Sequence, residues 1–349
     1  MKKKNKITMK DIAKKAGVSQ ATVSRVINNH PSVRPEVRRR VMELIQKLDY
    51  QINEIARSLV RNKAYLIGVI IPNISNPYFS EIMQSIEKTA KQYGYNILFS
   101  DSEGDVYKET KSIEVFLSRG VDGLLIVPIN PDTSSLLKLK KKNIPTVILT
   151  RNSKHFDSVA VDHIKGGMII ADHLIDLGHT KVAFVGNKED DKLKGFKQRV
   201  LERGLEFNEE HIIKIESGYM NYYEIFSQLQ KQLSRSLKFT GFFACNDLTA
   251  FCLIQILQEY GFRIGKDIAM VGFDNTFIAS ITKPTLTSVS QPIKEIGRIG
   301  TELLLKRING NYENYPINIK LEPALVVRES SGMINLEKLL NREIKRKNI

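Results

Sequence analysis

The sequence predicts an N-terminal all-α headpiece with a helix-turn-helix, joined to an α/β core of two parallel-sheet subdomains. Two short amphipathic helices with a glycine between them begin near residue 8, in the most basic part of the chain. From residue 66 onward, short apolar runs alternate with amphipathic helices, a pattern typical of parallel sheets covered on both faces. These runs are too many for one sheet, so we expect two subdomains facing each other across a cleft.

The composition is typical of a globular protein, with 42% hydrophobic and 26% charged residues among 349. No apolar run approaches the roughly 20 residues of a membrane span. The basic start MKKKNK leads into an amphipathic helix rather than the apolar core of a signal peptide, so we expect a cytoplasmic protein. Cys245 and Cys252 lie among apolar residues, so neither a metal site nor a disulfide is expected, and no cofactor is predicted.

The net charge of +15 is concentrated at the two ends of the chain. Residues 1–63 carry a net +11 and residues 334–349 a net +3, which leaves +1 for the residues between. A polyanion such as DNA attracts a field of this kind without regard to base sequence. A membrane surface or simple solubility would also tolerate a basic segment, but neither explains the helix-turn-helix patterning of this one.

The helix-turn-helix pattern extends over the stretch MKDIAKKAGVSQATVSRVIN, residues 9–28. Thr8 can cap the first helix, with Asp11 completing a capping box, and Gly17 supplies the backbone freedom that a tight turn needs. Ser19 can cap the second helix. That helix has an apolar face of Val23, Val26 and Ile27 and a polar face of Gln20, Ala21, Ser24, Arg25 and Asn28. Such a helix can enter the major groove of DNA; the alternative is a surface helix pair without a function.

Two further helices are expected before the core begins. The segment Arg34–Leu48, with Pro35 at a first helical position, predicts a third helix that closes the headpiece. Asn53 could cap a short helix over 54–59, which has too little apolar surface to be stable alone. Its Leu59 would then be exposed unless it enters a DNA minor groove as an apolar wedge; the alternative is a flexible linker.

Polar side chains follow the apolar strand-like runs of the core, which cover 66–71, 95–100, 122–128, 145–150, 181–186, 240–245 and 267–273. In open α/β sheets, ligands bind beyond the carboxyl ends of the strands. The residues found there include the stretch 75–79, Asp101, Arg151, Lys192, Asn246, Asp247, Asp274 and Asn275. Two shorter strand-like runs, SVAV (158–161) and LTSVS (286–290), lead to Asp162 and Gln291 in the same way. Carboxylates, amides and cations beside aromatic rings suit a polyhydroxyl ligand. Each position alone could equally cap a helix, as we expect of Asp162 and Asp247.

The sequence gives little support to an enzyme. Its histidines are scattered without a two-histidine metal spacing, and no nucleophile-elbow or phosphate-loop pattern is present. The carboxylates serve as readily for ligand hydrogen bonds as for catalysis. We therefore expect a binding protein.

Taken together, these motifs resemble the LacI/GalR family of bacterial transcriptional regulators. The resemblance covers roughly residues 8–330, through MKDIAKKAGVSQATVSRVIN, NEIARSL, IGVIIPNISNPYF, DGLLIVP, HLIDLGHTKVAFVG, MVGFDNT, LTSVSQP and LVVRES. It implies a homodimer that represses carbohydrate-use genes from a near-palindromic operator, with a core like a periplasmic sugar-binding protein. It also implies four parts: a headpiece (1–51), a hinge helix and linker (52–64), an effector-binding and dimerisation core (65–332) and a basic C-terminal tail (333–349). The alternatives are a solute-binding protein and a weakly specific architectural DNA-binding protein.

The resemblance also assigns roles to residues. Gln20, Ala21 and Arg25 match base-reading positions, where Ala21 suits a thymine methyl and Arg25 a guanine, and Leu59 matches the minor-groove lever. The full set of predicted DNA contacts is Thr8, Ser19, Gln20, Ala21, Thr22, Ser24, Arg25, Asn28, Ala56 and Leu59. The predicted effector contacts are Asn76, Tyr78, Phe79, Asp101, Arg151, Lys192, Asn246, Asp274 and Gln291.

The chain departs from the family's ribose-type pocket at two positions. Lys192 stands in place of the usual arginine, and Thr150 replaces the acid often found before Arg151. Because arginine and lysine are not equivalent at a hydroxyl clamp, ribose itself is in doubt, whereas a sugar, sugar derivative or sugar phosphate is still expected. The family also contains members whose DNA binding is strengthened by a ligand or by a co-regulator protein. The tail is expected to be frayed rather than a tetramerising coiled coil.

Overall fold

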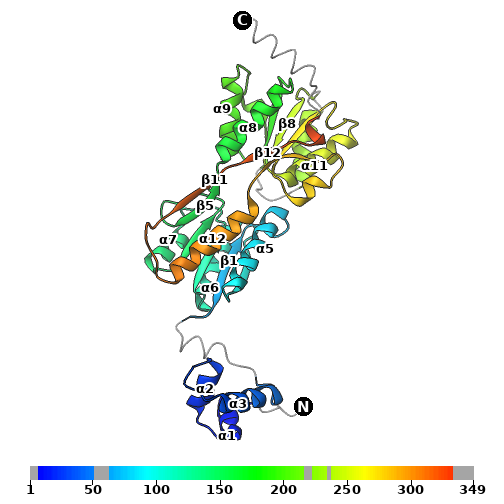
Figure 1. Cartoon of the computed structure of the whole chain (residues 1–349). Coiled ribbons are helices and arrows are strands. Elements are labelled where there is room, and N and C mark those ends of the chain that lie inside the picture. Colours follow the sequence, from blue (N-terminus) through cyan, green and yellow to red (C-terminus); the bar gives the residue numbers. More distant parts are fainter. Residues whose placement is uncertain (1–6, 51–62, 216–221, 234–236, 333–349) are drawn as a thin grey trace, which may run out of the picture. The chain divides into compact units, whose positions relative to one another are not determined.

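The computed structural model describes residues 7–50, 63–215, 222–233 and 237–332 (Figure 1). The chain divides between Ala64 and Tyr65 into two compact units, an N-terminal headpiece and a core. Most of the predicted hinge helix and linker, with Ala56 and Leu59, lies outside the described residues, as does the tail from residue 333.

The headpiece holds the three predicted helices, α1 (Met9–Ala16), α2 (Gln20–Ile27) and α3 (Pro35–Lys47). Thr8 caps α1 and forms both bonds of the predicted capping box with Asp11, and Ser19 caps α2. Gly17 ends α1 in the left-handed region at φ 64°, which favours glycine. Ile12, Val23 and Val41, one from each helix, are completely buried and form the centre of the headpiece core.

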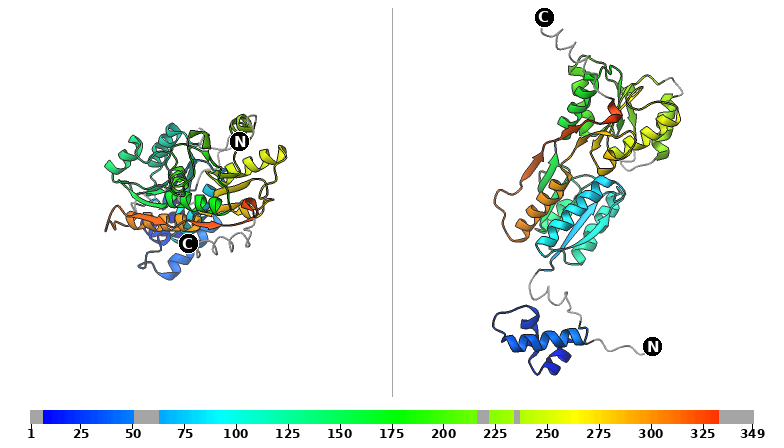
Figure 2. Two further views of the ribbon diagram at one scale, coloured as in Figure 1. Left: turned by 90° about the horizontal axis from the view of Figure 1, so that it is seen from above. Right: turned by 45° about the vertical axis from the view of Figure 1, so that its right-hand side comes forward.

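The first core subdomain contains a six-stranded parallel sheet with the order β11-β5-β4-β3-β1-β2. Its strands are β1 (Leu66–Ile71), β2 (Asn96–Asp101), β3 (Gly123–Ile126), β4 (Thr146–Leu149), β5 (Asp157–Val161) and β11 (Asn318–Leu321). Alternate residues of β1 face two helix layers, because Ile67 and Val69 pack with α5 (Pro77–Gln92) and α12 (Ile293–Ile308), whereas Ile70 packs with α6 (Val106–Ser118) and α7 (Ser134–Lys141). Helices α5 and α12 lie side by side on their face of the sheet (Figure 2).

The second core subdomain repeats this design with the order β12-β10-β9-β8-β6-β7. Its strands are β6 (Val182–Gly186), β7 (Ile212–Lys214), β8 (Gly241–Ala244), β9 (Ala269–Asp274), β10 (Thr287–Ser290) and β12 (Ala324–Val326). Among the strand pairs of the described residues here, β10–β12 is antiparallel and the others are parallel. One face packs with α8 (His163–Asp176) and α9 (Asp191–Glu202), the other with α10 (Tyr222–Leu233) and α11 (Asp247–Glu259).

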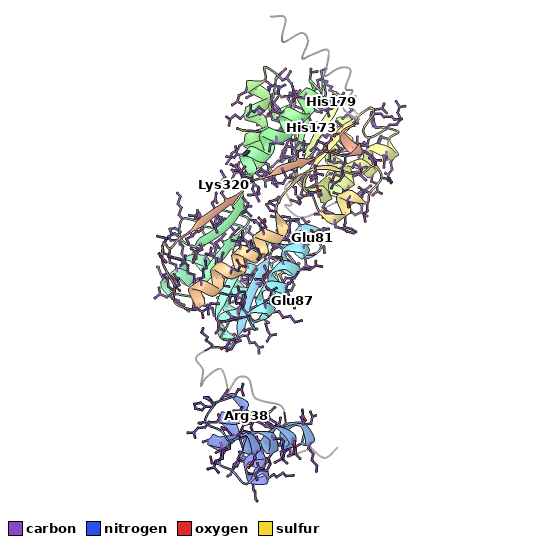
Figure 3. All side chains as sticks on the ribbon, viewed as in Figure 1. Arg38, Glu81, Glu87, His173, His179 and Lys320 are labelled. Atoms are coloured by element: carbon purple, nitrogen blue, oxygen red, sulfur yellow. The ribbon has the colours of Figure 1, made fainter. Side chains whose placement is uncertain are left out.

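The chain crosses between the two subdomains three times. It passes from β5 to α8, from β10 to α12, and from β11 to β12, which belong to different sheets. Two ion pairs join the first crossing to the third: Asp162 with Lys320 at 2.5 Å, and Lys165 with Glu322 at 2.5 Å. Figure 3 labels Lys320 on β11. At the second crossing, Gln291 Oε1 lies 3.4 Å from Nε2 of His163 at the first crossing. Because the first crossing thus contacts both of the others, the three crossings form one hinge region.

The predicted strands are confirmed, with ends shifted by no more than two residues, but three strands were not predicted. β7 and β12 have three residues each, and β11 alternates between exposed and half-buried residues at a sheet edge, so none produces a long apolar run. Asp162 caps α8 as predicted. The same prediction for Asp247 is wrong: Asn246 caps α11, whereas Asp247 is its first helical residue and points to a neighbouring loop.

The described residues include no helix long and apolar enough to cross a membrane. Both cysteines are free thiols. Within the described ranges, no group of three or more His, Cys, Asp or Glu side chains is placed to hold a metal ion.

Candidate functional sites

The outer face of α2 presents side chains suited to reading base edges. Gln20, Ala21 and Arg25 are exposed on this short helix. An amide, a methyl group and a guanidinium are the groups that contact adenine, thymine methyl and guanine in the major groove. Ser24 and Asn28 on the same side are half-buried and bond to each other, with Asn28 Nδ2 at 3.4 Å from Ser24 Oγ.

Two predicted DNA contacts, Thr8 and Ser19, already have local partners. The Thr8 backbone N–H and hydroxyl both donate to Asp11 Oδ2, at 2.9 and 2.6 Å. These bonds from Thr8 lower the pKa of Asp11, which keeps a negative charge at the positive end of α1. Ser19 Oγ accepts from the Thr22 N–H at 3.0 Å and lies 2.9 Å from Thr22 Oγ1. These four side chains therefore fix the two helix starts.

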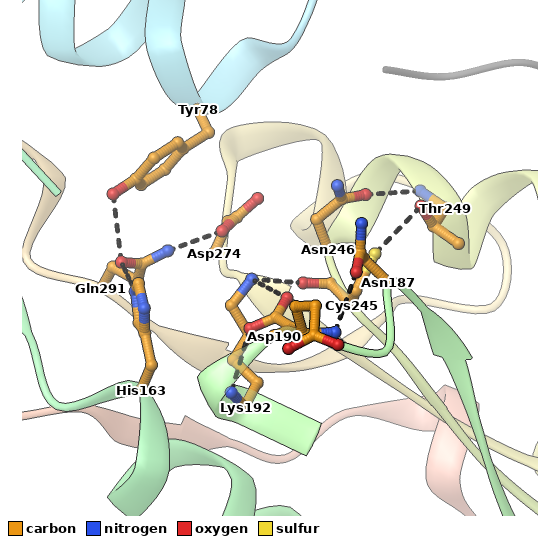
Figure 4. Close-up of polar contacts among 11 residues, drawn as sticks. Tyr78, His163, Asn187, Asp190, Lys192, Cys245, Asn246, Thr249, Asp274 and Gln291 are labelled. Carbon is orange, nitrogen blue, oxygen red and sulfur yellow. Dashed lines mark hydrogen bonds and ion pairs between the residues drawn. The ribbon is translucent and has the colours of Figure 1, made fainter. Parts of the chain in front are cut away.

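In the core, three predicted effector residues form one hydrogen-bonded chain across the two subdomains (Figure 4). The Tyr78 hydroxyl, on α5, donates to Gln291 Oε1 at 3.0 Å. Gln291, at the β10–α12 crossing, donates from Nε2 to Asp274 Oδ1 at 2.7 Å. All three residues are buried, with exposed fractions of 5% or less. A polar ligand that replaced these bonds would contact both subdomains at once.

Lys192 lies beside this chain with its ammonium group fully engaged. Its Nζ donates to the Cys245 carbonyl at 2.8 Å, pairs with Asp190 at 3.4 Å and lies 4.8 Å from the centre of the Phe273 ring. Asp190 caps α9, which places its carboxylate at the end of β6. We call Tyr78, His163, Asp190, Lys192, Asp274 and Gln291 the junction cluster.

Burial shifts the pKa values of the junction cluster. Desolvation, together with the nearby Asp247 carboxylate, raises the pKa of Asp274 well above its usual value. Burial, reinforced by the Lys192 charge, lowers the pKa of His163 to about 4, so its imidazole is neutral at pH 7. Burial opposes the Lys192 charge, but Asp190 and Asp274 outweigh it and raise the pKa of the ammonium group. The cluster thus holds one cation, one partner anion and several neutral hydrogen-bonding groups.

Strained backbone surrounds the same place. Asp274 and Asn275 have φ values of 120° and 54°, and the β-branched Thr150, directly after β4, has φ 67°. Such conformations are costly and collect at ligand sites. The Asp247 carboxylate holds the strained turn after β9, since it accepts from the Thr276 N–H at 2.7 Å and the Ser288 hydroxyl at 2.6 Å.

The other predicted effector residues have different local roles. Asn76 caps α5 and Asn246 caps α11. Asp101 accepts from the backbone N–H groups of Ile74 and Glu103, each at 2.8 Å. Phe79 packs edge-on against Tyr78, with 5.1 Å between ring centres, and Arg151 is exposed after β4.

His163, Asp190, Phe273 and Cys245 were not predicted as site residues. His163 and Asp190 follow the ends of β5 and β6, so the strand-end rule could have found them. Phe273 lies within β9 and Cys245 contributes a carbonyl, which no side-chain pattern reveals.

Comparison with known proteins identifies the family to which this chain is similar. Residues 8–53 match the model of bacterial regulatory proteins of the lacI family, and residues 171–331 match a periplasmic binding protein-like domain. Catabolite control protein A of Priestia megaterium is 34% identical over 311 residues, which cover 87% of this chain and 93% of the relative. The chain belongs to the lacI family.

Solved lacI-family structures share the fold. The lac repressor dimer bound to operator and the anti-inducer ONPF superposes with a TM-score of 0.82 at 25% identity, covering 94% of this chain and 99% of the repressor chain. A LacI family regulator from Enterococcus faecium with bound ribose gives a TM-score of 0.67 at 28% identity, covering 76% of this chain and 98% of that one. The predictions of the fold and of a DNA-binding transcriptional regulator are therefore confirmed, and the family is one of regulators rather than enzymes.

Proposed function

We propose that this lacI-family regulator represses genes of carbohydrate use and that a small neutral sugar, bound at the junction cluster, controls its affinity for operator DNA. The chain of bonds from Tyr78 through Gln291 to Asp274 carries this proposal, because it joins the two subdomains. A ligand at these residues binds one relative arrangement of the subdomains better than another. Its differential affinity sets the change in DNA affinity, typically ~1–3 kcal/mol.

A second contact between the subdomains supports this coupling. Glu81 lies one turn after Tyr78 on α5, and its Oε1 accepts from the Phe277 N–H of η2 (Phe277–Ser280) at 3.0 Å. Figure 3 labels Glu81 on α5. The beginning of α5 therefore contacts the second subdomain through both residues, and a ligand that moves Tyr78 also changes the Glu81 contact.

The charges of the junction cluster favour a neutral sugar over a sugar phosphate. The Lys192 ammonium already has Asp190 and the Cys245 carbonyl as partners, with only 13% of its side chain exposed. A phosphate here would lie near the Asp190 and Asp274 carboxyl groups without a free buried cation. Hydroxyl groups, which both donate and accept, can bond to Gln291 and Asp274 without this cost. The ribose found in one solved relative is of this class.

A thermal-shift panel of pentoses, hexoses and their phosphates tests the effector. A ligand that binds the native state raises the melting temperature, so we expect at least one unphosphorylated sugar to do so. A sugar phosphate that stabilises the protein more than its parent sugar would contradict the proposal and would direct attention to the exposed Arg151.

On DNA, we propose that Gln20, Ala21 and Arg25 read bases while Thr8, Ser19, Thr22, Ser24 and Asn28 position the two helices, and that Ala56 and Leu59 contact the minor groove. The exposure of the first three residues supports this division. Fluorescence anisotropy tests it: at ~0.15 M salt, a specific regulator prefers its operator to unrelated DNA by about 1,000-fold or more. Equal binding to every duplex would favour an architectural protein.

The regulator is expected to act as a dimer on a near-palindromic operator, as in the lac repressor dimer bound to operator. Exposed apolar side chains on the core, including Phe277 (67% exposed) and Ile281 (59%), offer surface for such an interface. Light scattering on the purified chain measures the mass directly. A co-regulator protein stays a prediction.

A further inference from the structure

The loop after the recognition helix has two polar side chains that hydrogen bonds hold in place and that keep N–H donors unused. This loop joins α2 to α3 and contains Asn29 and His30, both exposed. Asn29 leaves α2 in the left-handed region at φ 56°, and the His30 N–H still donates to the Arg25 carbonyl at 2.9 Å. The loop is thus tied directly to the proposed base-reading residue Arg25.

Arg38 determines which way the Asn29 amide faces. From α3, its Nη1 donates to Asn29 Oδ1 at 2.5 Å and its Nη2 to the His30 carbonyl at 2.7 Å; Figure 3 labels Arg38 on the headpiece. A guanidinium has donors only, so the amide atom that it contacts must be the oxygen. The two N–H donors of Asn29 Nδ2 are therefore the part of the amide that Arg38 does not use.

The His30 ring is fixed by the same reasoning. Its Nδ1 accepts from the Ser32 backbone N–H at 3.3 Å and lies 2.8 Å from the Ser32 hydroxyl. A backbone N–H can only donate, so in the neutral imidazole the proton is on Nε2. The second ring nitrogen of this exposed histidine is then another N–H donor.

We propose that Asn29 and His30 form a phosphate-binding loop beside the recognition helix, with Arg38 as the residue that positions it. Phosphate oxygens only accept hydrogen bonds, and the Asn29 amide and the His30 ring each keep an N–H donor for such a partner. A helix in the major groove has the sugar–phosphate backbone on both sides, and the loop leaves the end of that helix. Arg38 adds a positive charge behind the two donors. The inference rests on the proposed docking of α2 in the groove.

The test uses the full chain and two duplexes of equal length, one selected by the wild-type protein from random sequences and one unselected. Asn29→Ala should weaken binding to both duplexes about tenfold, because a phosphate contact carries no base information. Asn29→Asp should weaken both further, since it replaces the donor by an anion. Aspartate still accepts from Arg38, so this variant keeps the loop bonded. Arg25→Ala should instead weaken mainly the selected duplex.

Arg38→Met should lower affinity for both duplexes well beyond Arg39→Met, the matched control. Arg39 is the next residue on α3, carries the same charge and is 81% exposed beside Glu43. Asn29→Ala should leave the salt dependence unchanged, because it removes no charge.

Two results would overturn the proposal: Asn29→Ala binding both duplexes within twofold of wild type, or Asn29→Ala weakening the selected duplex alone. An Arg38→Met variant that lowers the salt slope by about one beyond Arg39→Met, while Asn29→Ala has no effect, would make Arg38 itself the phosphate contact. If wild type does not distinguish the duplexes, the proposed specific regulator fails, and the loop is still tested on the unselected one.

Discussion

The headpiece surface and the junction cluster differ in the exposure of their residues and in the range of the contacts that hold them. On the headpiece, Gln20 and Arg25 are exposed, and the caps that orient their helix come from residues three positions apart, such as Ser19 and Thr22. In the core, Tyr78 and Gln291 are 213 residues apart and both are buried.

The difference follows from the size of the partner. A polyanion as large as DNA can bind an exposed face, where charge acts at long range and local caps are sufficient. A small ligand must be surrounded, so its contacts come from many elements and lose water, which shifts pKa values as it does for Asp274. Changes in the core should therefore cost more than equivalent changes in the headpiece.

The largest expected effect is on core stability. Arg307 pairs with Asp157 at 2.6 Å, and their side chains are 1% and 0% exposed. Arg307→Met strands a buried carboxylate and should lower the unfolding free energy of the core by about 3–5 kcal/mol. The exposed headpiece pair of Arg39 and Glu43 should contribute less than ~1 kcal/mol by the same measurement, urea unfolding at pH 7. Equal losses of unfolding free energy in the two regions would contradict the expectation that changes in the core cost more.

The second-largest expected effect is on the affinity for the effector. Asp274→Ala removes the acceptor of the Gln291 bond and the proposed ligand contact, so affinity for any sugar found in the thermal-shift panel should fall about 100-fold. Operator binding without sugar should be kept. Calorimetry provides the measurement, with Asp267→Ala as control, because Asp267 pairs with Arg263 at the surface. An unchanged sugar affinity would remove Asp274 from the site.

A smaller effect is expected for base reading. Arg25→Ala should cost about 1–3 kcal/mol of operator affinity and relax specificity at one base pair of each half-site. Anisotropy with operators altered one base pair at a time measures both quantities. Uniform weakening on every sequence would make Arg25 a phosphate contact and would leave Gln20 and Ala21 as the base readers.

The smallest expected effect is a loss of core stability at low pH. Burial lowers the pKa of His173 to about 4, below its unfolded value near 6.5, so the unfolded state binds the proton more readily. The contribution of neutral His173 to the unfolding free energy is therefore fully present above pH 6.5 and is lost as the pH falls toward 4. Between pH 7 and pH 5 the core should lose about 1–2 kcal/mol from this group.

His173→Gln is the matched variant for this pH dependence. Glutamine can keep the bond to the Ser331 hydroxyl, 2.9 Å from His173 Nε2, but cannot take up a proton. The variant should lose part of the core's pH dependence. Further contributions are expected from His163, whose pKa is also about 4, and from His179, whose pKa burial also lowers. A variant as pH-sensitive as wild type would exclude His173 as a source.

The sequence by itself determined the features whose causes are local. The capping box of Thr8 and Asp11, the turn at Gly17 and the start of α3 at Pro35 depend on neighbours within a few positions, and the structure contains all of them. The apolar runs likewise determined the central strands of both sheets, because a strand buried on both faces must be apolar throughout.

Only the tertiary structure decided which polar residues meet and what state they are in. Asn246 and Asp247 are adjacent with similar side chains, yet one caps α11 and the other holds the strained turn after Asp274. The edge strand β11 pairs with β5 although 160 positions separate their first partners, Asn318 and Ser158. Burial, long-range pairing and pKa shifts arise from the sum of many distant contacts, so no local pattern of residues can specify them.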